Sequence, residues 1–310
     1  MLLLLVLLLQ DEAVAMLQPG IRLVERPGVL HFYDGRRVVS LRTDATGREA
    51  IRSAIADRND TEARRDAHDL LARLGLVLDG AVDGPESVAH PVAAEYVTAT
   101  TAGWVRPSEA AERLAAQDVH VLDDPQLQAI IADSGLSAKC LPDVEAIAGL
   151  DARRSIVVAG AAPRRCLRPL PRVNEACVRA GITWLPIGGF DGSRLRVGPL
   201  VVPGQSACLS CAQRRIAANV AYFDLQPLVA DAPSAPAPAA LARWAQALAA
   251  LVLLAWIGGC DVRLPGRVFT LGTDELDVRH GLVHRVPRCD TCAAPDYIAA
   301  AAPWEIARDH

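Results

Sequence analysis

The chain has 310 residues, of which 51% are hydrophobic, 22% charged and 4% aromatic, and its net charge is −4. These values are typical of a folded protein with one large domain or two smaller ones. They provide no overall basic charge of the kind that binds nucleic acid, so we expect no nucleic-acid partner.

The chain begins with an apolar run, Met1 to Leu9. An export signal would carry basic residues ahead of this run, but the first basic residue is Arg22. The run is also shorter than the roughly 20 residues that span a bilayer. We therefore interpret residues 1–15 as an extension or a misassigned start, and we expect a cytoplasmic protein with no membrane partner.

A small module with strands followed by helices is expected at residues 16–79. Three short runs favour strands: 21–25, 29–33 and 37–41. The apolar spacing then becomes helical, with Asp44 as a candidate N-cap and a second helix at 61–74 that ends at Gly75. Three strands followed by two or three helices predict a winged-helix module.

The rest of the chain reads as an α/β domain. Residues 80–92 are rich in Gly, Pro, Asp and Ser and are predicted to be a linker. Alternating strand and helix patterns then indicate a mostly parallel sheet over 93–310. Strands are expected at 96–102, 119–122, 155–159 and 182–187, and helices at 108–116, 125–133 and 172–180. A long apolar segment at 241–257 contains Arg243 and Gln246, which favours a buried helix over a membrane span.

Four of the eight cysteines form two Cys-x-x-Cys pairs, Cys208/Cys211 and Cys289/Cys292. A single pair could be a redox dithiol. Two pairs without other candidate ligands favour a structural Zn²⁺ site, because zinc binds four thiolates in a tetrahedron. Such a site is closed to substrate, so we expect it to hold structure and to perform no catalysis.

Nucleotide-binding motifs are missing. Neither G-x-G-x-x-G nor G-x-x-x-x-G-K-[ST] occurs. If the first strand of the sheet is 96–102, the turn after it contains Gly103 as its single glycine. Asp123 and Asp124 follow the next predicted strand, where an acidic residue could bind a ribose, but a helix N-cap and a solvent-facing turn are the preferred interpretation.

Other candidate sites are weak. His280 and His284 have the i, i+4 spacing of a helical metal site, but residues 279–286 are predicted to form a hairpin, so we expect two exposed histidines. Arginine pairs such as Arg214/Arg215 are interpreted as solvated faces.

In this order, the parts resemble the TOMM precursor leader peptide-binding proteins, also called ocin-ThiF-like proteins. These are partners of YcaO cyclodehydratases in the biosynthesis of thiazole- and oxazole-containing peptides. The Asn-x-x-Cys-x-x-x-Gly pattern from Asn174 to Gly181 is similar to a helix-to-strand unit of the E1/ThiF superfamily. The Gly-Pro-Leu-Val-Val-Pro-Gly passage from Gly198, which leads to Cys208, is similar to the family's approach to its first cysteine pair. The resemblance covers nearly the whole chain from about Met16.

The N-terminal module resembles the PqqD-like recognition element of RiPP biosynthesis, a winged helix that holds a leader peptide as an added strand. This resemblance implies an edge strand that binds peptide through Arg37, Val38, Val39, Ser40 and Leu41. It also implies a facing helix at 61–74, whose candidate groove residues are Arg65, His68, Asp69 and Arg73.

The resemblance implies a non-catalytic partner protein that binds the precursor leader and delivers the core peptide to a YcaO cyclodehydratase. The acidic residue that active E1 enzymes carry after the strand at 155–159 is absent, since Gly160 is followed by Ala-Ala-Pro. We therefore expect structural Zn²⁺, no ATP, and a possible homodimer in a degenerate E1/ThiF-like domain. Two alternatives stay open: a divergent E1-like enzyme that adenylates a peptide carboxylate, and a winged-helix DNA-binding regulator.

Overall fold

The computed structural model describes residues 17, 21–33, 37–56, 62–77, 91–160, 170–218 and 235–293. The chain divides into two compact units, Met1–Arg113 and Leu114–His310. The predicted extension at 1–15 and most of the predicted linker at 80–92 lie outside the described residues. The predicted domain boundaries stay predictions.

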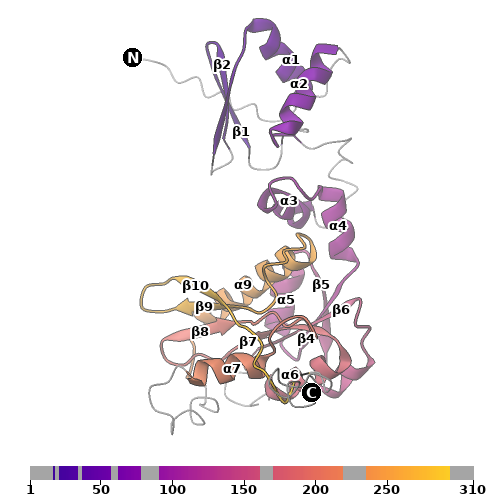
Figure 1. Ribbon diagram of the computed structural model, residues 1–310, viewed down its shortest axis with the longest axis vertical. Coiled ribbons are helices and arrows are strands. Elements are labelled where there is room, and N and C mark those ends of the chain that lie inside the picture. The colour runs from indigo at the N-terminus through magenta and orange to yellow at the C-terminus, as the bar shows by residue number, and fades with distance from the viewer. Residues whose placement is uncertain are drawn as a thin grey trace, which may run out of the picture. The chain divides into compact units, whose positions relative to one another are not determined.

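The first unit begins with a three-stranded antiparallel sheet (Figure 1). Its strands, in spatial order, are β1 (Arg22–Arg26), β2 (Val29–Tyr33) and β3 (Val38–Arg42). Because side chains alternate between the two faces of a strand, Leu30 and Phe32 point into the core and are almost completely buried. Since β2 lies in the middle, β1 and β3 are both edge strands.

Two helices, α1 (Ala45–Ile55) and α2 (Glu62–Arg73), follow the sheet. As predicted, Asp44 caps α1: its carboxylate accepts a hydrogen bond from the backbone nitrogen of Gly47 at 2.8 Å. Gly75 ends α2 with a left-handed φ of 64°. The predicted order of three strands and then helices is confirmed, and the assignment to the winged-helix class stays a prediction.

The strand predicted at 96–102 is wrong, because the segment is helical. Helix α3 covers Pro91–Thr100 and buries Ala93, Ala94, Val97 and Thr98, which share one helical face. The threonines favoured a strand in the sequence, but their hydroxyls donate to carbonyls one turn back, as Thr98 does to Ala94 at 3.0 Å. Helix α4 (Pro107–Ala115) follows, as predicted.

The second unit contains a seven-stranded sheet with the order β10-β9-β8-β7-β6-β4-β5. Its parallel part consists of β5 (Ser137–Leu141), β4 (Asp118–Leu122), β6 (Ser155–Gly160) and β7 (Thr183–Ile187). Its antiparallel part consists of β8 (Arg194–Val197), β9 (Arg267–Gly272) and β10 (Val278–Leu282). The predicted parallel sheet is thus confirmed for one part. The prediction from the sequence missed β5, because this edge strand lacks a strong apolar pattern.

Helices cover both faces of this sheet. The connection from β4 through α5 (Pro125–Asp133) to β5 and the connection from β6 through α6 (Leu170–Ala180) to β7 run in opposite directions along the sheet. Right-handed crossovers in opposite directions place their helices on opposite faces. Accordingly, α5 and α9 (Ala239–Ile257) lie on one face, and α6 and α7 (Leu209–Ala218) on the other (Figure 1).

The predicted helix at 241–257 is confirmed as α9. Among the described residues, α9 is the one helix long and apolar enough to cross a membrane, and half of its most apolar window is buried in the protein. The polar Gln246, which interrupts the apolar run, is itself 7% exposed.

Candidate metal centre and open sheet edge

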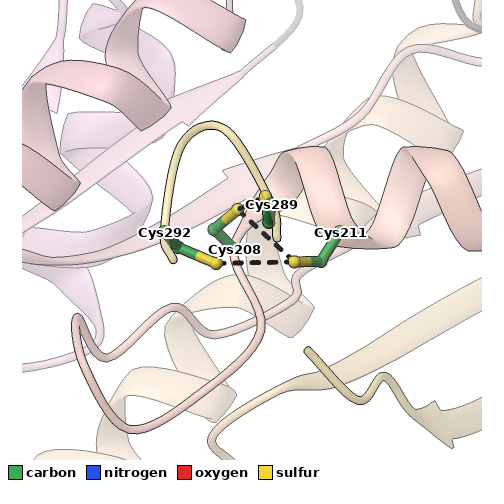
Figure 2. A group of neighbouring side chains, drawn as sticks. All are labelled: Cys208, Cys211, Cys289 and Cys292. Carbon is green, nitrogen blue, oxygen red and sulfur yellow. Dashed lines mark hydrogen bonds between the residues drawn. The ribbon is translucent and has the colours of Figure 1, made fainter. Parts of the chain in front are cut away.

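The four predicted zinc ligands come together in the second unit. Cys208 immediately precedes α7 and Cys211 lies in its first turn, whereas Cys289 and Cys292 lie on the segment that follows β10. Figure 2 shows the four side chains turned toward one another. Their sulfur atoms all lie within 4.8 Å of one another.

The sulfur geometry fits a tetrahedral metal ion. The Sγ atoms are 3.8 Å apart for Cys208 and Cys211, 3.7 Å for Cys208 and Cys289, and 3.5 Å for Cys211 and Cys292. Four Zn–S bonds of about 2.3 Å at tetrahedral angles would space the sulfurs by about 3.8 Å. A disulfide would need about 2.0 Å, so the spacing matches shared coordination and no disulfide.

The pKa values of three of the cysteines are shifted, because their thiols are buried close together. Burial raises the pKa of Cys289, but backbone N–H donors from Cys292 and Thr291, together with the neighbouring thiols, outweigh it and lower that pKa to about 7. Burial, reinforced by the negative charge of Cys208, raises the pKa of Cys211, and the pKa of Cys292 is raised for the same reasons. Without a cation, the raised pKa values favour protonated thiols at Cys211 and Cys292. A divalent cation such as Zn²⁺ would displace these protons and link the four cysteines as a structural site.

Residues behind the cysteines hold the two pairs in place. The buried Asn174 of α6 accepts a hydrogen bond from the backbone nitrogen of Leu209 at 3.0 Å and donates to the Ser210 hydroxyl at 3.2 Å. Ser210 in turn lies 3.0 Å from the Thr291 hydroxyl of the second pair. Sequence reasoning identified Asn174 by resemblance but gave it no role, and the hydroxyl bridge had no signal in the sequence.

Arg214 and Arg215, interpreted as part of a solvated face, are exposed, and they also bind the C-terminal segment. Arg214 forms an ion pair with Asp290. Arg215 donates to the carbonyl oxygens of His284 at 2.7 Å and Arg285 at 3.1 Å. The segment that carries the second cysteine pair is therefore fastened to α7 by side chains as well as by the thiols.

The hairpin predicted at 279–286 is wrong in its position. His280 and Gly281 both lie within strand β10, which pairs antiparallel with the earlier strand β9, so the turn of the hairpin precedes β10. The Nδ1 atom of His280 lies 2.7 Å from Nη1 of Arg267, and no group of metal-binding side chains among the described residues includes His280 or His284.

The structure relocates the position where a nucleotide would bind. Nucleotides bind such sheets at the carboxyl ends of two neighbouring strands whose connections leave in opposite directions. Because 96–102 is a helix, these strands are β4 and β6, and the first strand-to-helix turn is Asp123-Asp124, before α5. Asp123 has a left-handed φ of 39°, a conformation that favours glycine, so this turn places a carboxylate where a phosphate loop would use glycine.

Asp124 occupies the anion-binding end of α5. Its Oδ1 accepts a hydrogen bond from the Leu127 nitrogen at 3.0 Å, which confirms the predicted N-cap role. Its Oδ2 accepts from Nε2 of the buried Gln246 on α9 at 3.5 Å. A Cβ added to Gly160, at the end of β6, would lie 3.8 Å from this Oδ2. The carboxylate thus lies between the ends of β4 and β6, where a phosphate would be bound in a nucleotide-binding relative.

The second feature of interest is the open edge of β3 in the first unit. The backbone nitrogen of Thr43 donates to the carbonyl oxygen of Gly28 at 3.1 Å, which continues the β2–β3 register. Bonded pairs alternate with unbonded pairs in an antiparallel ladder, so Leu41 and Val39 bond to β2. The N–H and C=O groups of Val38, Ser40 and Arg42 therefore point away from the sheet. No strand among the described residues pairs with them, so they can bond to an added strand.

The predicted peptide-binding residues of the strand differ in their environment. Val39 and Leu41 are half-buried against the core, whereas Val38 and Ser40 face the other side of the sheet and are exposed. The Ser40 hydroxyl lies 2.8 Å from Nδ1 of His31. Arg37 has a structural contact, since its guanidinium donates to the carbonyl oxygens of Leu74 and Gly75 at 3.3 and 3.4 Å and so caps the end of α2.

The predicted groove residues of α2 are also distributed over several environments. Arg65, Asp69 and Arg73 are exposed, and Arg73 donates to the carbonyl oxygen of Asp69 in its own helix at 3.2 Å. His68 is mostly buried, and its Nε2 has no hydrogen-bond partner among the described residues. Contact of these four residues with a peptide stays a prediction.

Comparisons with known proteins show the fold. No family model matches the sequence, and no curated protein matches it. The chain is similar to a heterocyclase solved in complex with substrate and cofactor, at 19% identity and a TM-score of 0.65, over 90% of this chain and 39% of that chain. It is similar to MccB of E. coli solved with MccA-N7isoASN, at 15% identity and a TM-score of 0.59, over 90% of this chain and 99% of that chain.

The heterocyclase TruD is a third similar structure, at 18% identity and a TM-score of 0.58, over 90% of this chain and 43% of that chain. The chain therefore spans less than half the length of the heterocyclases that it matches and the full length of MccB. At these identities the likeness establishes a shared α/β fold, and the E1/ThiF-like class stays a prediction.

Proposed function

We propose that this chain is a non-catalytic partner protein in the biosynthesis of azole-containing peptides. It would bind the leader of a ribosomal precursor peptide and deliver the core to a YcaO cyclodehydratase. The fold supports this proposal, since the similar structures are heterocyclases, one of them with substrate, and a microcin biosynthetic enzyme in complex with MccA.

The observation that carries the proposal is the open edge of β3. An extended peptide that joins this edge would bond to the backbone groups of Val38, Ser40 and Arg42. The peptide side chains on the core side of the sheet would cover Val39 and Leu41, which are half-buried at the edge of the core. Backbone bonds would supply affinity, and the side chains beside them would supply specificity.

The absence of ATP chemistry is part of the proposal. The fold itself can hold a nucleotide, since MccB has been solved with AMPCPP. In this chain the Asp124 carboxylate already accepts the N–H group at the start of α5, and Asp123 adds a second negative charge. Both would repel phosphate at the position where the fold favours it. The adenylating alternative is therefore disfavoured.

The zinc-linked second unit would act as the scaffold that docks on the cyclodehydratase. A leader held by the first unit would raise the local concentration of the core peptide at the partner's active site. One leader site of modest affinity could then serve several cyclisations. Homodimer formation and a cytoplasmic location remain predictions.

Calorimetric titration tests the proposal. The full-length chain is titrated with the synthetic leader of the precursor peptide encoded beside its gene, and we expect saturable binding with a stoichiometry of about one leader per chain. Adding the chain to the neighbouring YcaO enzyme and the full precursor should accelerate cyclisation, as measured by mass loss. Absence of leader binding, or cyclisation by this chain alone with ATP, would overturn the proposal.

A further inference from the structure

The outer face of the three-stranded sheet is basic. The strands turn nine side chains to this face, and no Asp or Glu is among them: Arg22, Val24, Arg26, Val29, His31, Tyr33, Val38, Ser40 and Arg42. Within the described part of the chain, its three arginines form no ion pair. On the opposite face, Arg52 of α1 pairs with Glu25 of β1, with Nε 2.9 Å from Oε1.

The three arginines differ in their distance from the open edge. Arg42 lies on β3 itself, and Arg26 lies on β1. Val29 of β2 is paired with each of them, so the two arginines occupy the same row across the sheet. Strands are spaced by about 4.8 Å, so a strand added beside β3 would lie about 5 Å from the backbone of Arg42 and about 14 Å from that of Arg26. Arg42 is therefore the arginine that an added peptide meets directly.

An apolar side chain shares this edge with Arg42. Val38 is 59% exposed, faces the same side of the sheet and precedes Arg42 by four positions. It is paired with Tyr33, which is 43% exposed. An exposed apolar pair lies at one end of the edge, and at the other lies a cation that forms no ion pair with any described residue. The edge is therefore chemically asymmetric.

We propose that Arg42 and Val38 select the leader. The segment that pairs with β3 carries an acidic side chain opposite Arg42 and an apolar side chain opposite Val38. Both partners lie on one face of the added strand, so they are separated by three residues in the leader, whichever way it runs. The two alternate residues between them point to the half-buried side of Val39 and Leu41 and are apolar. This inference rests on the proposed leader binding and adds the chemical class of leader.

The test measures leader affinity by fluorescence anisotropy, with the labelled synthetic leader of the adjacent precursor gene as the probe. Arg42→Glu should weaken binding about 5-fold or more, because a cross-strand attraction becomes a repulsion. Arg26→Glu is the matched control, on the same row and face, and should change affinity by less than about 2-fold at physiological salt, where charges are screened beyond about 8 Å. A leader whose acidic residue is replaced by Lys should bind Arg42→Glu more tightly than the wild-type chain.

The outcomes separate this inference from the proposed function. Leader binding that is equally sensitive to Arg42→Glu and Arg26→Glu indicates general charge attraction and overturns the selection by Arg42. If the affinity for the leader is high and Arg42→Glu does not change it, this inference is overturned and the leader-binding function is left intact. A wild-type chain that does not bind the leader overturns both. Circular dichroism of each variant checks that the module remains folded.

Discussion

The side-chain oxygen of Asn174 lies 3.0 Å from the backbone nitrogen of Leu209, and this hydrogen bond joins helix α6 to the first cysteine pair. Asn174 is completely buried and its amide nitrogen donates to Ser210, so the first cysteine pair depends on a residue distant in sequence. The candidate metal centre is consequently part of the core of the second unit, alongside Trp184 and Cys177.

Asn174→Ala should destabilise the second unit by about 2 kcal/mol, because it removes a helix cap and leaves buried polar groups without partners. The measurement is thermal unfolding together with zinc content. Glu175→Ala, an exposed change on the same helix, is the control and should leave both unchanged. Equal melting temperatures for the two variants would contradict the capping role.

The purified chain should contain about one zinc ion, measured by plasma mass spectrometry. Cys292→Ser should lose the ion and unfold at a lower temperature, because three thiolates hold Zn²⁺ less tightly and metal binding contributes to folding. Cys260→Ser, at an exposed cysteine outside the cluster, is the matched control. Full zinc content in Cys292→Ser would argue against the tetrathiolate site.

Mg-ATP should not bind the wild-type chain in calorimetry, and ATP–pyrophosphate exchange with the precursor peptide should be absent.

Asp124→Ala should lower the free energy of unfolding by about 1 kcal/mol, because helix α5 loses its N-cap. Asp133→Ala, at the C-terminal end of the same helix, should be neutral or slightly stabilising, because a negative charge there opposes the helix dipole. Equal stabilities of Asp124→Ala and Asp133→Ala would contradict the capping role, whereas ATP–pyrophosphate exchange by the wild-type chain would favour the adenylating alternative.

Ser40→Pro should abolish leader binding while the module stays folded. The change removes the N–H group at the centre of the open edge, and proline is tolerated where an edge strand's N–H faces away from the sheet. Ser40→Ala removes the contact with His31 but keeps the N–H group, so it should bind the leader nearly as well as the wild type. Equal affinities for both variants would show that the peptide does not pair with β3.

Two titratable groups outside the cysteine cluster should lower the stability of the second unit on acidification. Burial lowers the pKa of His120. Below the ordinary value of 6.5, the unfolded chain therefore binds a proton that the folded chain does not, and the free energy of unfolding decreases as the pH is lowered. The hydrogen bond from Lys139, whose Nζ lies 2.8 Å from Oδ2 of Asp118, lowers the pKa of that carboxyl, so stability falls again below 3.8.

Urea unfolding between pH 8 and pH 3 would measure both steps. His120→Gln should flatten the dependence just below pH 6.5, and Lys139→Met should weaken the acid step alone. A slope unchanged in His120→Gln would contradict the assignment of the first step to this residue.

Much of the fold was determined by local patterns in the sequence. The strands of the first unit, the caps at Asp44 and Gly75, and the helix at 125–133 follow from turn chemistry and apolar spacing, which act over a few residues. The four cysteines were also predictable, because paired ligand spacing is a local feature. The exposed strand β5 and the helix α3 were not predictable, because contacts with distant parts of the chain decide whether such residues form a strand or a helix.

The sequence by itself determined that two cysteine pairs exist, that phosphate-loop glycines are missing and that strands precede helices in the first unit. Only the tertiary structure decided that Asn174 positions a cysteine pair, that Asp124 lies between the ends of β4 and β6, and that Arg42 shares the open edge with Val38. These relationships join residues brought together by strand order and register. Strand order and register are set by packing and hydrogen bonding across the whole unit, and no local pattern in the chain encodes them.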